Sequence, residues 1–150
     1  IYINSKIKIS KIMKNDGIKS IINNLKSFVL SKSNLKFHFD VFHGSGKIEK
    51  AILLLDKKDQ YDFYDFLIKK SSFNRGNMFI CRSKKVIEQY YKDIFKWLKK
   101  CESIFGFKEG AYGETRMYAF LAERYLAYWF NKYSHCFTWP IFFSDTSKFK

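Results

Sequence analysis

Cysteine is scarce in this sequence and is never paired at short spacing. Its three cysteines, Cys81, Cys101 and Cys136, lie far apart, and their number is odd. This excludes a disulfide framework and a zinc site built on a CxxC pair, and reduced thiols are expected. No run of about 18 apolar residues is present and no secretory signal pattern opens the chain, so no spanning helix is expected. These absences predict a cytoplasmic protein.

Acidic residues and arginine are also few. The chain has 28 Lys and Arg against 14 Asp and Glu, a net charge of +14, and only four of the basic residues are arginine. Such a charge predicts an anionic partner: nucleic acid, an acidic membrane surface or a phosphorylated ligand. Because side chains that read bases or phosphates favour arginine, nucleic acid is not expected. Contact with an acidic membrane surface stays open, and would place the protein at the inner face of the cell membrane.

Carboxylates at metal-binding spacing are missing as well. No DxD pair occurs in the chain, and the aspartates at 56, 59, 62 and 65 are explained by helix capping and a solvated helix face. With 47 % hydrophobic and 20 % aromatic residues in 150, the chain has the composition of a folded domain. Because it begins at Ile1, we expect either a single domain or the C-terminal part of one.

The spacing of apolar residues predicts strands that alternate with helices. Strands are predicted at 1–9, 35–42, 78–81 and 137–143. Helices are predicted at 18–29, 48–55, 59–69, 83–106 and 112–130. Asp59 and Ser83 are the expected N-caps of two of these helices. This order predicts an α/β fold, a mixed sheet flanked by helices.

The segment 112–130 is apolar almost all the way round a helix but carries Arg116, Glu123 and Arg124. Charges buried without partners cost several kcal/mol each, so these three need an explanation. Seven residues at about 100° each return Glu123 to within roughly 20° of Arg116, so both should face one side. They form either an internal ion-pair network or a polar strip along a ligand cleft.

Two further polar residues stand next to predicted strands. His43 joins the strand at 35–42 to the sequence Gly44-Ser45-Gly46. That sequence is either a plain turn or a loop whose N–H groups bind an anion, and it lacks the spacing of a Walker or dinucleotide motif. Asn77 stands at the entrance of the strand at 78–81 and can both donate and accept hydrogen bonds.

Three motifs in order resemble the DUF4422 family of bacterial glycosyltransferase-like proteins from capsule and O-antigen gene clusters. They are FHGSGKIEKAILLL at 42–55, the NMFI strand at 77–80 with its following helix, and the R-x-x-x-FL-x-ER pattern at 116–124. The resemblance covers about residues 35–147. The HYRRY-like motif of the family's N-terminal part is not found, which suggests the C-terminal portion of the full fold.

The resemblance implies transfer of a sugar from a nucleotide-sugar donor to a saccharide acceptor, on a GT-A-like fold. It implies Glu123 or Asp145 as the catalytic base, Arg116 and Arg124 facing phosphate, and Asn77 and His43 orienting sugar hydroxyls. Mn²⁺ or Mg²⁺ is compatible with such a fold, although no ligand pattern is visible. The alternatives are a non-catalytic interaction domain of the same fold and a basic module that binds nucleic acid or a membrane surface. The oligomeric state is left open.

Overall fold

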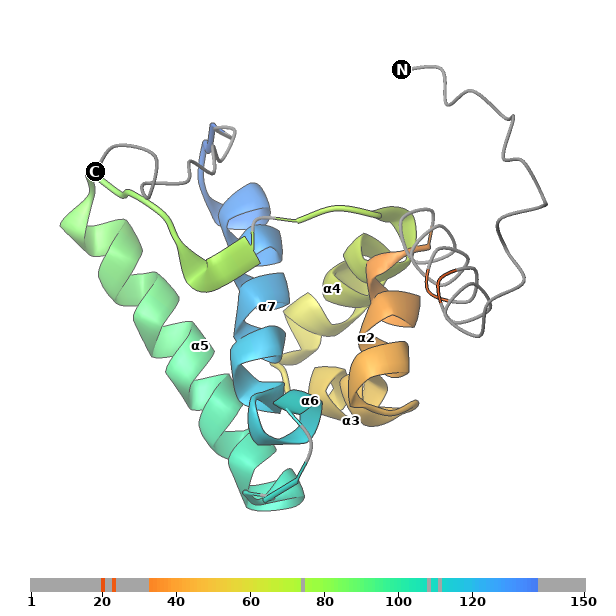
Figure 1. The fold of residues 1–150 in the computed structure, drawn as a ribbon. Coiled ribbons are helices and arrows are strands. Elements are labelled where there is room, and N and C mark those ends of the chain that lie inside the picture. Colours follow the sequence, from red (N-terminus) through yellow and green to blue (C-terminus); the bar gives the residue numbers. More distant parts are fainter. Residues whose placement is uncertain are drawn as a thin grey trace, which may run out of the picture.

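The structure, a computed structural model, describes residues 20, 23, 33–73, 75–107, 109–110 and 112–137, and within these ranges it contains helices and no strand. In chain order its elements are α2 (Leu35–His43), α3 (Lys47–Leu53), α4 (Lys57–Lys69), η2 (Arg75–Asn77), α5 (Lys84–Phe105), α6 (Tyr112–Thr115) and α7 (Met117–Tyr133) (Figure 1). The α/β fold with a mixed sheet predicted from the sequence is therefore wrong. None of the helices described is long and apolar enough to cross a bilayer.

The segment predicted as a strand at 35–42 is helix α2. Asn34 caps it, since its side-chain oxygen accepts a hydrogen bond from the Phe37 N–H at 2.8 Å. Leu35, Phe39 and His43 are all buried. These residues are spaced by four, so the alternation that predicted a strand also contains a helical stripe. The cap decides between the two patterns, and the strand prediction missed it.

The run at 78–81 is not a strand either. Its Phe79 ring packs against Tyr90 at 5.5 Å and Phe130 at 4.9 Å between ring centroids, while Ile80 is 99 % exposed. The segment is thus an irregular connection held by one aromatic side chain. The strand predicted at 1–9 lies outside the described residues, as does nearly all of the strand predicted at 137–143.

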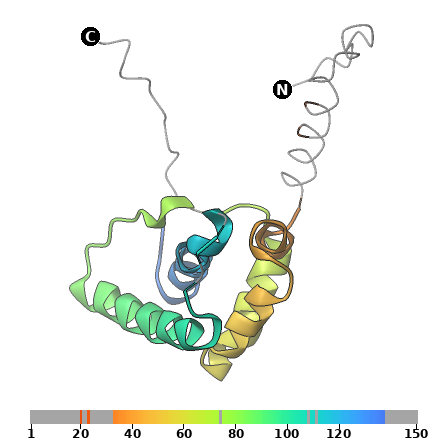
Figure 2. The same ribbon diagram turned by 60° about the horizontal axis from the view of Figure 1, so that its bottom comes forward.

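Helix α7 is the centre of the domain. Figures 1 and 2 show it between α5 on one side and α2 and α4 on the other, and all three of these helices contact it. Its buried residues cover more than half of the helix circumference. They are Met117, Leu121, Arg124, Tyr125, Leu126, Tyr128 and Trp129. The predicted burial is confirmed for α7, whereas residues 112 and 114–116 of the same predicted segment are exposed.

The sequence predicted both the N-cap and the C-terminal end of helix α5. The Ser83 hydroxyl accepts from the Val86 N–H at 3.4 Å, and Gly106, in the left-handed region with φ of 62°, ends the helix. Its core-facing stripe includes Trp97, whose indole N–H donates to the Ala51 carbonyl at 2.7 Å. Cys101 on the same stripe is fully buried, and burial raises the pKa of its thiol to about 12.

Helix α4 begins earlier than predicted, and its buried face differs. Its N-cap is Asp56, so Asp59 lies inside the first turn. The core face consists of Asp59, Phe63 and Leu67, whereas Tyr61 is 77 % exposed. The fold thus buries a carboxylate and leaves an aromatic ring of the same helix in solvent.

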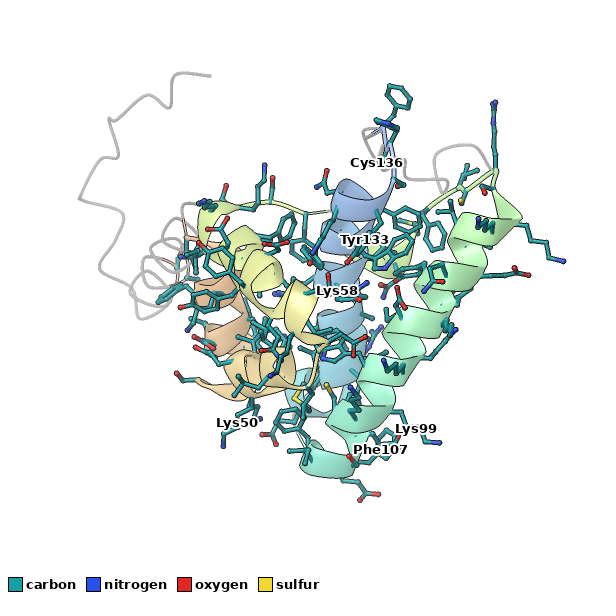
Figure 3. The ribbon with its side chains drawn as sticks, turned by 180° about the vertical axis from the view of Figure 1, so that it is seen from behind. Lys50, Lys58, Lys99, Phe107, Tyr133 and Cys136 are labelled. Atoms are coloured by element: carbon teal, nitrogen blue, oxygen red, sulfur yellow. The ribbon has the colours of Figure 1, made fainter. Side chains whose placement is uncertain are left out.

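That carboxylate is the centre of a buried polar cluster, the Asp59 cluster, formed by Asp59, Tyr128, Lys132 and Tyr133. Asp59 Oδ1 accepts hydrogen bonds from the hydroxyls of Tyr128 at 2.8 Å and Tyr133 at 2.5 Å, and from Lys132 Nζ at 2.8 Å. Burial raises the pKa of Asp59, but the hydrogen bonds from Lys132 and the two tyrosines outweigh it and hold the pKa below its usual value. Lys58 lies over the Tyr133 ring, 5.2 Å from its centroid (Figure 3).

Candidate functional site

The helix predicted at 112–130 is divided in two at Arg116. Residues 112–115 form α6, and Arg116, with φ of −106° and ψ of 14°, precedes α7 as its N-cap. Its side chain is exposed, with the guanidinium 5.1 Å from the Tyr112 ring centroid and one N–H donating to the Tyr112 hydroxyl at 2.5 Å. Arg116 is thus a surface cation stacked on an aromatic ring, and does not need an internal partner.

Glu123 and Asn77 are brought together by the short helix η2, which lies on α7. The Gly76 N–H donates to Glu123 Oε1 at 3.0 Å, and the Asn77 amide donates to the Ala119 carbonyl at 3.5 Å. Gly76 and Asn77 both have positive φ, 85° and 52°, so the backbone makes a tight turn here. Asn77 is exposed and Glu123 is half-buried. The carboxylate therefore binds the turn with one oxygen.

Arg124 belongs to a different surface of α7, the one that faces α2. Its side chain is only 1 % exposed, and its guanidinium lies 4.9 Å from the ring centroids of both Phe39 and Phe73. One N–H donates to the Phe120 carbonyl at 2.9 Å, and another to His38 Nδ1 at 3.1 Å. Because arginine can only donate, His38 Nδ1 must be the acceptor and the ring neutral. A phosphate could reach this guanidinium only if an aromatic ring moved.

His43 is also internal. It is 4 % exposed, its ring lies 4.5 Å from Phe39 and 4.4 Å from Phe120 between centroids, and its Nδ1 donates to the Gly113 carbonyl at 2.8 Å. This bond joins the end of α2 to α6. A Cβ atom on Gly113 would lie only 2.4 Å from the Phe42 carbonyl oxygen, so the two backbones approach as closely as glycine alone allows.

The residues Gly44 to Gly46 form a turn between two helices. Gly44 and Gly46 have φ of 93° and 79°, and α3, which follows, has only seven residues. Lys47 at its start lies 3.3 Å from Glu114 of α6. His43 therefore lies at the end of a helix and not at the end of the strand predicted at 35–42, and the two glycines turn the chain between α2 and α3.

Burial gives His43 a testable pH dependence. Burial lowers its pKa below the ordinary value of 6.5, opposed by its hydrogen bond to Gly113 and assisted by Arg124 and Lys47. The neutral ring is thus favoured in the folded state. The stability it contributes is complete above about pH 6.5 and is lost as the pH falls through the folded pKa. We expect the free energy of unfolding, measured with urea, to fall between pH 7.5 and 5.5.

His43→Asn is the variant that isolates this effect, because its amide can still donate to the Gly113 carbonyl but does not titrate. It should show a flatter pH dependence over the same range. His135→Gln, which changes an exposed histidine, should leave the slope of the parent protein. An unchanged slope in His43→Asn would assign the acid sensitivity to other groups.

The predicted site residues therefore separate into two groups. Arg116, Asn77 and Glu123, together with Tyr112, form what we call the α7 surface group, because positions 116, 119 and 123 lie along one face of the helix. His43 and Arg124 lie inside the domain, against α2. Asp145 lies outside the described residues. In the part of the chain that is described, no three His, Cys, Asp or Glu side chains converge as a metal site.

Within the residues that the structure describes, these features define a basic helical domain with a polar surface group on its central helix. The chain belongs to the DUF4422 family: the model of this domain of unknown function matches residues 2–134, most of the chain. The match begins well before residue 35, where the recognisable motifs start. No curated protein and no solved structure matches the chain.

Proposed function

We propose that this chain is part of a glycosyltransferase that moves a sugar from a nucleotide-sugar donor to a saccharide acceptor during synthesis of a surface polysaccharide. Membership in DUF4422 and the resemblance of its motifs support the reaction class. The observation that carries the proposal is the α7 surface group, in which η2 places an amide beside the Glu123 carboxylate of α7, and the Arg116 cation before α7 lies against the Tyr112 ring of α6. A cytoplasmic location belongs to the same proposal.

The chemistry of transfer assigns a role to each member of this group. The acceptor oxygen forms a bond to the anomeric carbon, the bond to the diphosphate oxygen breaks, and the acceptor proton passes to a base. Glu123 is the candidate base, and Arg116 the cation for the leaving diphosphate. Their separation of seven positions spans about 10 Å along the helix, enough for one sugar ring. Asn77 would hydrogen-bond the sugar, and Tyr112 would stack on it. Asp145 is the second candidate base.

Glu123→Gln tests the base directly. Glutamine keeps an oxygen that can accept from the Gly76 N–H but cannot take a proton from an acceptor hydroxyl. Transfer should therefore fall by about 100-fold or more, with the melting temperature unchanged. The assay uses the full-length protein with UDP-, GDP- and CMP-sugars and candidate acceptors, and detects product by mass spectrometry.

Glu102→Gln, on the exposed outer face of α5, is the matched control and should keep full activity. Full transfer in a folded Glu123→Gln protein would exclude this residue as the base and direct attention to Asp145. Absence of both hydrolysis and transfer with every donor would contradict the reaction class itself.

The second candidate function is a non-catalytic interaction domain. It is favoured by the number of polar side chains that already have partners inside the domain: His43 with Gly113, Arg124 with His38, and Glu123 with Gly76. Binding of a saccharide or nucleotide sugar without turnover, measured by saturation-transfer NMR on the same full-length protein, would distinguish this role from catalysis.

A further inference from the structure

The outer face of α5 carries large apolar side chains that the core does not use. Figures 1 and 2 show α5 at the edge of the domain, with α7 on one side of it. Tyr91 and Phe95, one turn apart, are 43 % and 63 % exposed and are stacked on each other, with 5.9 Å between ring centroids. The Phe79 ring packs near Tyr91. The next residue, Ile80, is 99 % exposed. Moving such side chains from water into an apolar phase is favourable.

Basic side chains lie near these apolar residues in sequence. The set consists of Arg82, Lys84, Lys85 and Lys92, all exposed. Glu88 is the one carboxylate among them in sequence, and it pairs with Lys84 at 3.7 Å. Within the described ranges, Arg82, Lys85 and Lys92 form no ion pair, whereas Lys36, Lys96 and Lys132 elsewhere each bind a carboxylate within 3.0 Å.

We infer that this surface binds the face of a bilayer that contains anionic lipid. We call it the α5 patch, and it comprises Ile80, Tyr91 and Phe95 with the four basic residues Arg82, Lys84, Lys85 and Lys92. The pattern of an apolar stripe flanked by lysine on one side of a helix is typical of helices that lie in the headgroup region. Tyrosine is favoured at that depth because its ring is apolar and its hydroxyl polar. The basic side chains add electrostatic attraction to anionic headgroups.

Charge complementarity decides for lipid over a second copy of the chain. A copy would present another basic patch, since the chain carries a net charge of +14, and like charges would oppose each other across a two-fold interface. A bilayer containing phosphatidylglycerol offers negative charge over an area larger than the patch, with an apolar layer directly beneath it. The proposed binding of lipid does not depend on the proposed transfer reaction.

The test is flotation of the full-length protein with vesicles of phosphatidylcholine alone or with 30 % phosphatidylglycerol as the probe. The parent protein should float with the anionic vesicles only, and less so at higher salt. The triple variant Lys84→Glu, Lys85→Glu, Lys92→Glu should lower the partition coefficient by at least about tenfold, since each lysine near the surface contributes roughly 1 kcal/mol. The variant Phe95→Ser should also weaken binding.

Matched controls change the same number of charges and apolar groups elsewhere. Lys50→Glu, Lys57→Glu, Lys70→Glu alters three exposed lysines away from α5, and Leu53→Ser removes a side chain that is 69 % exposed. Both should float much better than the α5 variants. Equal loss in the control triple variant would show attraction by net charge alone and overturn the proposal. So would unchanged flotation of the α5 variants, or a patch-dependent dimer in light scattering without vesicle binding.

Discussion

Replacing Asp59 by alanine is expected to destabilise the domain by about 3 kcal/mol, because it removes the buried carboxylate that accepts hydrogen bonds from three side chains, and hydrogen bonds to a charged group are worth about 1.5–3 kcal/mol each. Asp59 is 5 % exposed, and its Oδ1 accepts from Tyr128, Tyr133 and Lys132 together. The variant leaves the buried Tyr128 hydroxyl without its carboxylate acceptor. For a domain of this size the melting temperature should drop by on the order of 15 °C, measurable by circular dichroism.

Asp62→Ala is the matched control, because Asp62 binds the same Lys132 at 2.7 Å from the same helix but is 51 % exposed at its side chain. An exposed ion pair contributes about 1 kcal/mol or less, so the melting temperature should move by only a few degrees. If both variants lost the same stability, the Asp59 cluster would contribute no more to the stability of the domain than a surface ion pair does.

Gly113→Ala is expected to separate α6 from α2. The new Cβ would lie 2.4 Å from the Phe42 carbonyl oxygen and 3.3 Å from His43 Nδ1. Both are held by helix α2, so the backbone must move, and overpacking of this kind costs about 1–3 kcal/mol. The hydrogen bond between His43 and the Gly113 carbonyl should weaken with it. Urea unfolding measures the loss, and faster hydrogen exchange at residues 112–116 locates it.

Gly110→Ala provides the comparison. Its Cβ would meet the Glu114 carboxylate at 3.0 Å, the end of a flexible side chain that can turn away. The unfolding free energy should stay within about 0.5 kcal/mol of the parent. A Gly113→Ala protein as stable as Gly110→Ala would mean that the contact between α2 and α6 has room to adjust.

Helices that show their pattern over many residues could be predicted from the sequence. Over the 22 residues of α5 the apolar stripe repeats several times, and Ser83 and Gly106 mark its two ends. Tyr91 fits the spacing of this stripe, but its side chain is exposed. Spacing alone cannot tell the edge of an apolar face from its centre, because that depends on the helices that pack against it.

For short segments, the sequence pattern predicted the wrong secondary structure. In α2, nine residues contain both an alternating pattern and a spacing of four, and the choice depends on the hydrogen bond from the Phe37 N–H to Asn34. Once this segment and the run at 78–81 were assigned as strands, the order of elements implied a sheet. Over only eight residues, an apolar pattern can fit both the period of a strand and that of a helix. A local error of this kind thus became an error of fold class.

For the candidate site, the sequence indicated the unusual residues but not which of them share a surface. Arg124 follows Glu123 directly, yet its guanidinium enters the core between Phe39 and Phe73 while Glu123 binds η2. Adjacent helical positions are about 100° apart, so adjacent charges can have unrelated partners. The sequence gives no sign of the steric role of Gly113. That role depends on a contact with His43, 70 residues away in sequence.

The central position of α7 has a consequence for how the chain is made. Its core partners come from α2, α4 and α5, all synthesised before it, and the bonds from His43 to Gly113 and from Asp59 to Tyr128 each link an early residue to a late one. A ribosome-bound chain that ends before α7 would have helices with apolar faces and nothing between them. The domain can therefore close only after α7 has emerged, and until then its aromatic side chains need protection from aggregation.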